Sequence, residues 1–203
     1  MNGARSFWLK QLHSWHWISA AVSLIGLILF AATGVTLNHA AQIPAEPVTQ
    51  ERTADLPAPL LERLTTFPEE TTDPVPDAVA RWATEALDAR IAGRPSETTP
   101  EEVYVALATP GGDGWLTIDR ATGEAVHETT TRGWIAYLND LHKGRNAGVV
   151  WYWFIDVFAV ACLVFALTGL ALLWLHARGR PSTWPLVGLG LLIPVIIALI
   201  FIH

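Results

Sequence analysis

The stretch LHSWHWISAAVSLIGLILFAATGVTLNHAA, from Leu12 to Ala41, decides the fold. It carries no charged side chain between Ile18 and Leu37, and at about 1.5 Å per helical residue this run crosses the roughly 30 Å hydrocarbon core of a bilayer. Histidines stand at both ends: His13 and His16 lie one helical turn apart at the start, and His39 closes the run. The stretch therefore predicts a transmembrane helix with imidazole groups at both membrane surfaces.

Two further apolar runs predict two more membrane spans. Val149 to Leu175 carries Asp156 as its one acidic or basic side chain, and Trp184 to Ile202 carries none. The composition agrees, because 51% hydrophobic and 16% charged residues would be unusual for a soluble domain. We therefore expect an α-helical membrane protein with three transmembrane helices.

The basic residues next to the spans predict the orientation, because cationic flanks are retained on the cytoplasmic side. Arg5 and Lys10 precede the first span, and Arg178 and Arg180 lie between the second and the third, so the N-terminus is expected inside and the C-terminus outside. Residues 40–146 hold nine basic and eighteen acidic side chains, which suits an outward-facing domain and excludes a nucleic-acid-binding one.

The N-terminal apolar run and the lone cysteine each have a further interpretation. A cleaved signal peptide ending near Ala40 and Ala41 would have a shorter apolar core, usually 7–15 residues, so we favour a retained helix. Cys162 is the one cysteine and lies within an apolar span, which excludes an intrachain disulfide and predicts packing as a small hydrophobe.

The polar segment between the first two spans predicts a small α+β domain. Residues 40–73 are rich in proline, threonine and glutamate, which indicates an extended linker with one short helix near 59–65. A helix is expected over 74–91, and strands over 101–108, 115–118 and 124–129. The segment 134–141 has the pattern of a short amphipathic helix at the membrane surface.

We expect the chain to divide as follows: cytoplasmic N-terminus 1–10, first span 11–39, periplasmic linker 40–73, α+β domain 74–131, interfacial helix and turn 132–146, second span 147–176, cytoplasmic turn 177–183 and third span 184–203.

Several motifs together resemble a known family. The helix and strand followed by WLTIDRATGEAV (residues 115–126) resemble the PepSY domain. Its setting between LHSWHW (12–17), YLNDLHKGR (137–145) and FIDVFAVACLVFALTGL (154–170) resembles the PepSY-associated transmembrane-helix family. The resemblance implies a bacterial inner-membrane protein with its α+β domain in the periplasm.

For characterised relatives, the resemblance implies a b-type haem reductase that passes electrons across the membrane to ferric iron or ferric siderophores. Larger relatives have four or more spans where this chain has three, so we expect a homodimer with one or two haem b groups per functional unit.

The histidines are the expected haem ligands, because neutral imidazole is a common axial ligand and two imidazoles on one iron favour electron transfer. Six of seven are expected at the membrane surfaces, three on each side, and His127 alone lies in the sheet region. The alternative for any one of them is an interfacial polar residue. The predicted roles are His39 and His176 as first ligands, His16 and His142 as their partners, His13 as a substitute for His16 or a propionate contact, and His203 as a terminal residue or a ligand in a dimer.

Two octapeptides in different spans are similar to each other. FAATGVTL (30–37) and FALTGLAL (165–172) match at five of eight positions, and their helices are expected to run in opposite directions. Gly34 and Gly169, beside Thr33 and Thr168, would let a flat macrocycle approach the backbone, and the pair would form inverted half-sites. Close packing of helices through glycine is the alternative interpretation.

Three charged residues near the spans have two possible roles each. Asp156 is either a proton or polar-network site near the outer haem or a hydrogen-bond partner of a neighbouring helix. Lys143 and Arg145 would neutralise haem propionates or hold phospholipid headgroups. The sequence has no phosphate-binding glycine loop and no dinucleotide-binding pattern, so the electrons are expected from a quinol or a redox protein.

What the resemblance implies and the residues themselves leave two functions from different classes. The first is a haem-bearing membrane reductase of ferric iron or ferric siderophore that serves iron acquisition. The second is a non-enzymatic, membrane-anchored binding or regulatory module that acts on a peptidase or a transporter.

Overall fold

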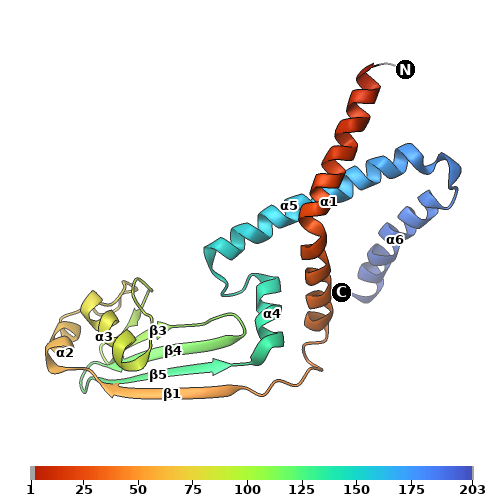
Figure 1. Ribbon diagram of the computed structural model, residues 1–203. Helices are drawn as coiled ribbons and strands as arrows, with labels where there is room; N and C mark the ends of the chain where they lie inside the picture. The colour runs from red at the N-terminus through yellow and green to blue at the C-terminus, as the bar shows by residue number, and fades with distance from the viewer. Residues whose placement is uncertain (1–2, 203) are drawn as a thin grey trace. The chain divides into compact units, whose positions relative to one another are not determined.

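The computed structural model describes residues 3–202, which form two compact units. One unit combines the chain up to Leu29 with the chain from Phe154 onward, and the other runs from Phe30 to Trp153. The elements are labelled in Figure 1.

Three helices in the described residues are long and apolar enough to cross a membrane. They are α1 (Gly3–Asn38), α5 (Gly148–His176) and α6 (Thr183–Phe201), and the short 3-10 helix η1 (Ala177–Gly179) separates the last two. The number of apolar helices agrees with the prediction. Helix α1 begins before the expected residue 11, because a helix continues through polar flanks as long as its backbone hydrogen bonds are made.

Helices α1 and α5 run in opposite directions within their shared unit. His16 contacts Thr168, and Gly26 contacts Phe158. Residue numbers therefore rise along α1 in the direction in which they fall along α5. Ser19 and Ser23 lie between the two α1 contacts and are buried. Their hydroxyl groups donate to Trp15 O at 2.6 Å and Ser19 O at 2.7 Å, which satisfies them inside the helix. Small, internally satisfied side chains allow this face to approach its neighbour closely.

The second unit contains a five-stranded antiparallel sheet in the order β1-β5-β4-β3-β2. The strands are β1 (Val48–Asp55), β2 (Glu97–Thr98), β3 (Glu102–Ala106), β4 (Gly112–Asp119) and β5 (Glu124–Thr131). Strands β3, β4 and β5 lie where the sequence predicted strands.

Strand β1 lies in the segment that was expected to be a linker. All eight of its residues pair with β5, from Val48 opposite Thr131 to Asp55 opposite Glu124. It is an edge strand with exposed, mainly polar side chains, so it lacks the alternation of apolar residues that marks a half-buried strand. Its conformation follows from the partner strand and not from its own sequence pattern.

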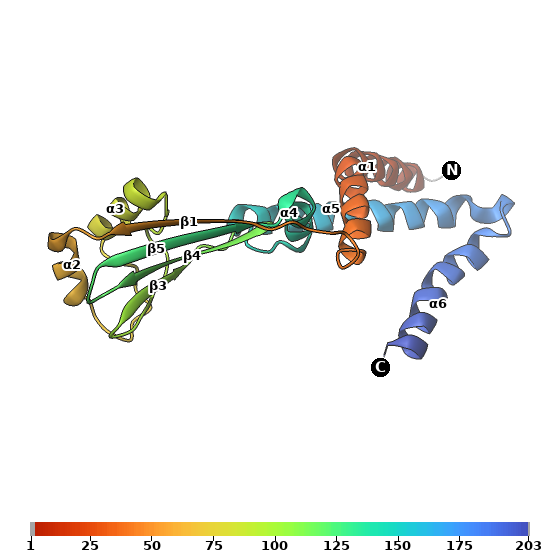
Figure 2. The ribbon, with the colours of Figure 1, turned by 90° about the horizontal axis from the view of Figure 1, so that it is seen from below.

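Helices α2 (Ala58–Thr65) and α3 (Asp77–Leu87) pack against one face of the sheet. The core between them includes Leu64 and Val79 from the helices and Val105, Leu116 and Ile118 from the strands. Helix α3 is shorter than the expected 74–91: it begins after Pro76 and ends at Asp88, whose φ of 58° is left-handed. Figure 2 shows α3 lying along the strands and α2 at their end.

Two side chains fix the ends of these elements. Arg120 is buried, and its guanidinium donates to the carbonyl oxygens of Leu64 at 3.1 Å and Phe67 at 2.7 Å, which holds the C-terminus of α2. In the turn from β4 to β5, the carboxylate of Asp119 accepts the backbone N–H groups of Ala121 and Thr122. The hydrogen bonds from Thr122 and Ala121 lower the pKa of Asp119 below its ordinary value of 3.8.

Helix α4 (Gly133–Lys143) lies at the opposite end of the sheet from α2 and α3 (Figure 1). It covers the expected segment 134–141 and ends at Gly144, whose φ of 68° closes the helix. Asp140 is buried and accepts the N–H of Gly111 at 2.8 Å, so α4 is attached to the turn between β3 and β4.

Candidate functional site

The unit that contains α5 holds the first half-site, which we define as His16, Phe165, Thr168 and Gly169. The imidazole of His16, on α1, lies with Nδ1 at 3.0 Å from Thr168 Oγ1 on α5. It stacks on Phe165 with ring centroids 4.9 Å apart and an angle of 18°. A Cβ at Gly169 would lie 3.1 Å from His16 Cε1, so the glycine provides the space for this ring.

The unit that contains the sheet holds the second half-site, which we define as His142, Phe30, Thr33 and Gly34. The imidazole of His142, near the end of α4, lies with Nδ1 at 2.7 Å from Thr33 Oγ1 on α1. Its ring centroid lies 5.0 Å from that of Phe30, at an angle of 42°. A Cβ at Gly34 would lie 3.6 Å from His142 Cε1.

The two half-sites are built from the same four kinds of residue in the same roles. Each uses the sequence Phe-x-x-Thr-Gly on one helix, and each receives a histidine from another helix. We expected the glycines to admit a flat macrocycle, and in the structure each one faces an imidazole ring. The octapeptide repeat therefore corresponds to a repeated histidine environment.

Each threonine hydroxyl contacts a helix carbonyl and a histidine Nδ1. Thr33 Oγ1 lies 3.1 Å from Phe30 O and 2.7 Å from Nδ1 of His142, and Thr168 Oγ1 lies 2.7 Å from Val164 O and 3.0 Å from Nδ1 of His16. When the hydroxyl donates to the carbonyl, its oxygen accepts a hydrogen bond from Nδ1–H. For His16 a backbone carbonyl, Phe165 O, also lies 3.2 Å from Nδ1 and can only accept. In a neutral ring with its hydrogen on Nδ1, Nε2 carries a lone pair that can bind a metal.

The three other described histidines at span ends carry the hydrogen on Nδ1 because of contacts within their own helices. Nδ1 of His13, His39 and His176 lies 2.8–3.0 Å from the carbonyl oxygen four residues earlier in the same helix. Because a carbonyl oxygen only accepts, these rings also present Nε2 as a lone pair. All three side chains are exposed.

Three predicted histidines gather near the end of α5. His16 and His176 line one hollow of about 500 Å³, together with Gly169, Leu172, Leu173, Ala177, Arg180 and Thr183. The ring of His13 lies beside that of His176, with centroids 6.1 Å apart and an angle of 82°. The hollow combines imidazoles, leucine walls and one guanidinium, and its volume is within the usual range for a small-molecule site.

The remaining predicted residues are not gathered in this way. Among the described residues, no hydrogen bond or ring contact joins His39 to His142. Lys143, the last residue of α4, and Arg145, just after it, are exposed, and Asp156 is exposed on α5. His203 lies outside the described residues. His127 is buried in the sheet core, with Nδ1 2.9 Å from Leu87 O.

The structure adds residues that the sequence interpretation did not include. Phe30 and Phe165 contact the imidazoles, and they are the matching first letters of the two octapeptides, so that repeat carried the signal. Asn139 lies with Oδ1 2.9 Å from Thr36 Oγ1, one turn along from the contact between His142 and Thr33. No sequence pattern indicates the contacts of Asn139 or of Asp140.

Within residues 3–202, no cluster of three or more histidine, cysteine, aspartate or glutamate side chains is arranged to hold a metal ion.

Comparison with known proteins identifies one family. The model of the PepSY_TM-like family matches residues 7–203, which is nearly the whole chain. No curated protein and no solved structure matches the chain.

Proposed function

From the membership of this chain in the PepSY_TM-like family, and from its two matched half-sites, we propose that it is a membrane oxidoreductase that carries haem b. It accepts electrons on the cytoplasmic side from a quinol or a redox protein and delivers them to periplasmic ferric iron or ferric siderophore. The reaction serves iron acquisition.

The observation that carries this proposal is the repetition of one histidine environment in two places. In each half-site a threonine contacts Nδ1, and a ring with its hydrogen on Nδ1 would leave Nε2 of His16 or His142 to hold the iron of haem. Haem would supply a one-electron carrier when bound, and two imidazoles on one iron favour electron transfer. The arrangement therefore supports electron transfer more than oxygen binding.

The hollow at the end of α5 fits the group best. His16 and His176 would hold the iron, and Leu172 and Leu173 would contact the apolar edges of the macrocycle. Arg180 would pair with a carboxylate of the macrocycle. His13, beside His176, would supply the alternative ligand there. His142 would hold the second haem, with His39 as its proposed partner.

A homodimer completes the proposed assembly. Three spans provide few helices around a cofactor, and two copies provide twice as many. Helix α6 buries no side chain in the described chain, and α5 is exposed at Asp156, so both helices have surface available for a second copy.

The proposed orientation places the sheet domain in the periplasm of a bacterium. Arg178 and Arg180 follow α5 and would remain in the cytoplasm. The eighteen acidic and nine basic side chains of residues 40–146 would attract ferric cations over a Debye length of about 8 Å at physiological salt.

An absorption spectrum with haem quantified per chain tests the proposal. We expect purified protein to show a Soret band that shifts to a b-type spectrum on reduction. His16→Ala, His176→Ala and His142→Ala should each lower the haem content or displace part of the absorbance. The control is His127→Asn, which keeps a donor for Leu87 O and removes an imidazole from the sheet core.

A colourless protein, expressed with ample haem, would refute the redox function. The remaining function would be the non-enzymatic, membrane-anchored binding or regulatory module. Loss of the spectrum in His127→Asn with no effect of the other substitutions would show that the cofactor lies elsewhere.

A further inference from the structure

Three arginines converge on a second hollow beside the histidine hollow. Arg5, Arg178 and Arg180 line a space of about 470 Å³, together with Trp174, Leu175, Ala177, Pro181 and Trp184. We infer that this hollow binds the phosphate of an anionic phospholipid headgroup. The inference does not depend on haem, because Arg5 and Arg178 line this hollow and not the histidine hollow, and Arg180 lines both.

The charge of the hollow is unbalanced within the described chain. No acidic side chain lines it, and the ion pair found among residues 3–202 joins Arg52 to Asp88 in the other unit. Guanidinium groups stay protonated and repel each other when they converge, so a bound anion would stabilise the arrangement. Their planar forks match the oxygens of a phosphate.

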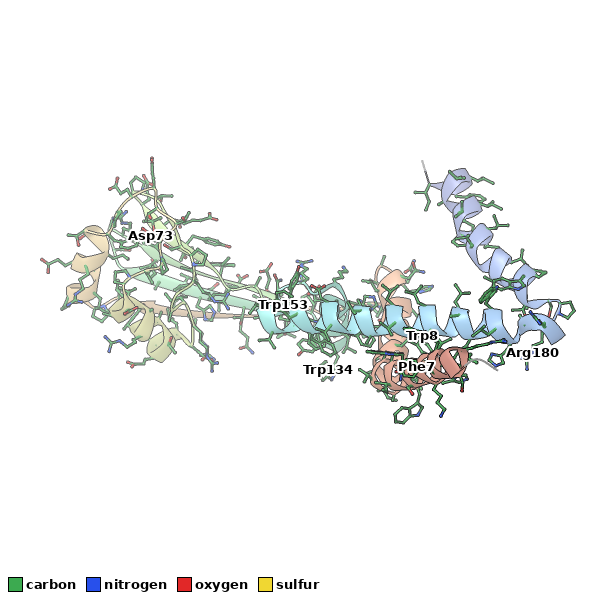
Figure 3. All side chains as sticks on the ribbon, turned by 90° about the horizontal axis from the view of Figure 1, so that it is seen from above. Phe7, Trp8, Asp73, Trp134, Trp153 and Arg180 are labelled. Atoms are coloured by element: carbon green, nitrogen blue, oxygen red, sulfur yellow. The ribbon has the colours of Figure 1, made fainter. Side chains whose placement is uncertain are left out.

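The position of the hollow points to a lipid as the source of that phosphate. Arg178 and Arg180 lie in the turn between the two apolar helices α5 and α6, and Figure 3 shows Arg180 at the end of α5. Trp174 and Trp184 are 67% and 46% exposed, as expected for indoles at headgroup depth. Leu186, on the first turns of α6, is 64% exposed and offers apolar surface to an acyl chain.

The same turn borders the histidine hollow. Ala177 and Arg180 line both spaces, so a phosphate bound on one side would hold the backbone that closes the other. Basic pockets at the cytoplasmic ends of transmembrane helices are the usual place for anionic headgroups.

The test compares lipids of the same chain length in delipidated full-length protein. Phosphatidylglycerol should raise the melting temperature more than phosphatidylcholine, and native mass spectrometry should show retained phosphatidylglycerol. Each substitution Arg5→Gln, Arg178→Gln or Arg180→Gln should weaken its binding about fivefold. The matched control is Arg81→Gln with Arg90→Gln, which removes exposed charges from the sheet unit and should leave lipid retention unchanged.

Three outcomes would overturn the inference. The first is an equal rise in melting temperature with the two lipids. The second is full retention of phosphatidylglycerol when Arg5, Arg178 and Arg180 are all replaced by glutamine. The third is inorganic phosphate protecting as strongly as the lipid does, which would assign the hollow to a free anion. The haem spectrum is a separate measurement, so its failure leaves this test intact.

Discussion

Threonine contacts the imidazole in each half-site. When its hydroxyl donates to its own helix, its oxygen accepts from the histidine, which places the hydrogen on Nδ1 and leaves the opposite nitrogen basic. The two sites differ in one respect. His16 has a second acceptor, Phe165 O at 3.2 Å, whereas Thr33 is the acceptor described for His142.

Replacing each threonine with valine removes the acceptor and keeps the shape. We expect Thr33→Val to lower haem affinity about 10–100-fold, because outer partners of ligating histidines have effects of that size. Thr168→Val should have a smaller effect, since His16 keeps the carbonyl of Phe165. Titration of the apoprotein with haemin measures both. Thr33→Ser and Thr168→Ser are the controls, and equal affinity in all four variants would refute the role of the hydroxyl.

The glycines of the two half-sites predict opposite responses to a methyl group. A Cβ at Gly169 would lie 3.1 Å from His16 Cε1, which is too close without movement of the ring, whereas at Gly34 the distance to His142 Cε1 is an ordinary 3.6 Å. Gly169→Ala should therefore shift the spectrum or lower the haem content. Gly34→Ala should retain the wild-type spectrum. Identical spectra of the two variants would contradict the described packing.

At the scale of elements, helix α4 connects the sheet to the second half-site. Asp140 accepts Gly111 N–H from the β3–β4 turn, and Asn139 and His142 contact Thr36 and Thr33 on α1. Contacts to the sheet and to α1 thus come from one short rigid element. A displacement of the turn that holds Gly111 would move His142.

Asp140→Ala should remove the attachment of α4 to the sheet and show whether His142 depends on it. It leaves the buried N–H of Gly111 without its acceptor, which costs about 1–3 kcal/mol. We expect a lower melting temperature and a changed ¹⁵N resonance of the His142 ring in protein without haem. Asp140→Asn keeps an acceptor oxygen and should restore the resonance. An unchanged His142 resonance in Asp140→Ala would show that α4 does not transmit the contact.

The elements that could be predicted are those whose local residue pattern is sufficient to specify them. The three apolar helices follow from uninterrupted apolar runs, and β3 to β5 follow from alternation and turn residues. Strand β1 was not predicted because its polar residues are ordered by β5, far along the chain. The same distinction applies to the histidines. The sequence shows which of them lie near the membrane surfaces, and only the tertiary structure shows that His16 and His142 contact the Thr-Gly pairs.

At the scale of the whole molecule, the chain is a membrane protein with a separate sheet domain. Its lone cysteine makes the proposed orientation testable, because Cys162→Ser provides a cysteine-free background. In that background, Asp113→Cys should react with an impermeant maleimide in spheroplasts, since Asp113 is exposed in the sheet unit. Ser182→Cys, in the turn before α6, should react only after lysis. The reverse pattern would place the sheet domain in the cytoplasm.

The long separation in sequence between each histidine and its threonine has a consequence for biogenesis. His16 lies 152 residues before Thr168, and His142 lies 109 residues after Thr33. At a translation rate of about 5–20 residues per second, the nascent first span waits roughly 8–30 s for the helix that seats its imidazole. During that interval the imidazole of His16 has neither Thr168 nor Phe165 beside it, because α5 has not yet been synthesised.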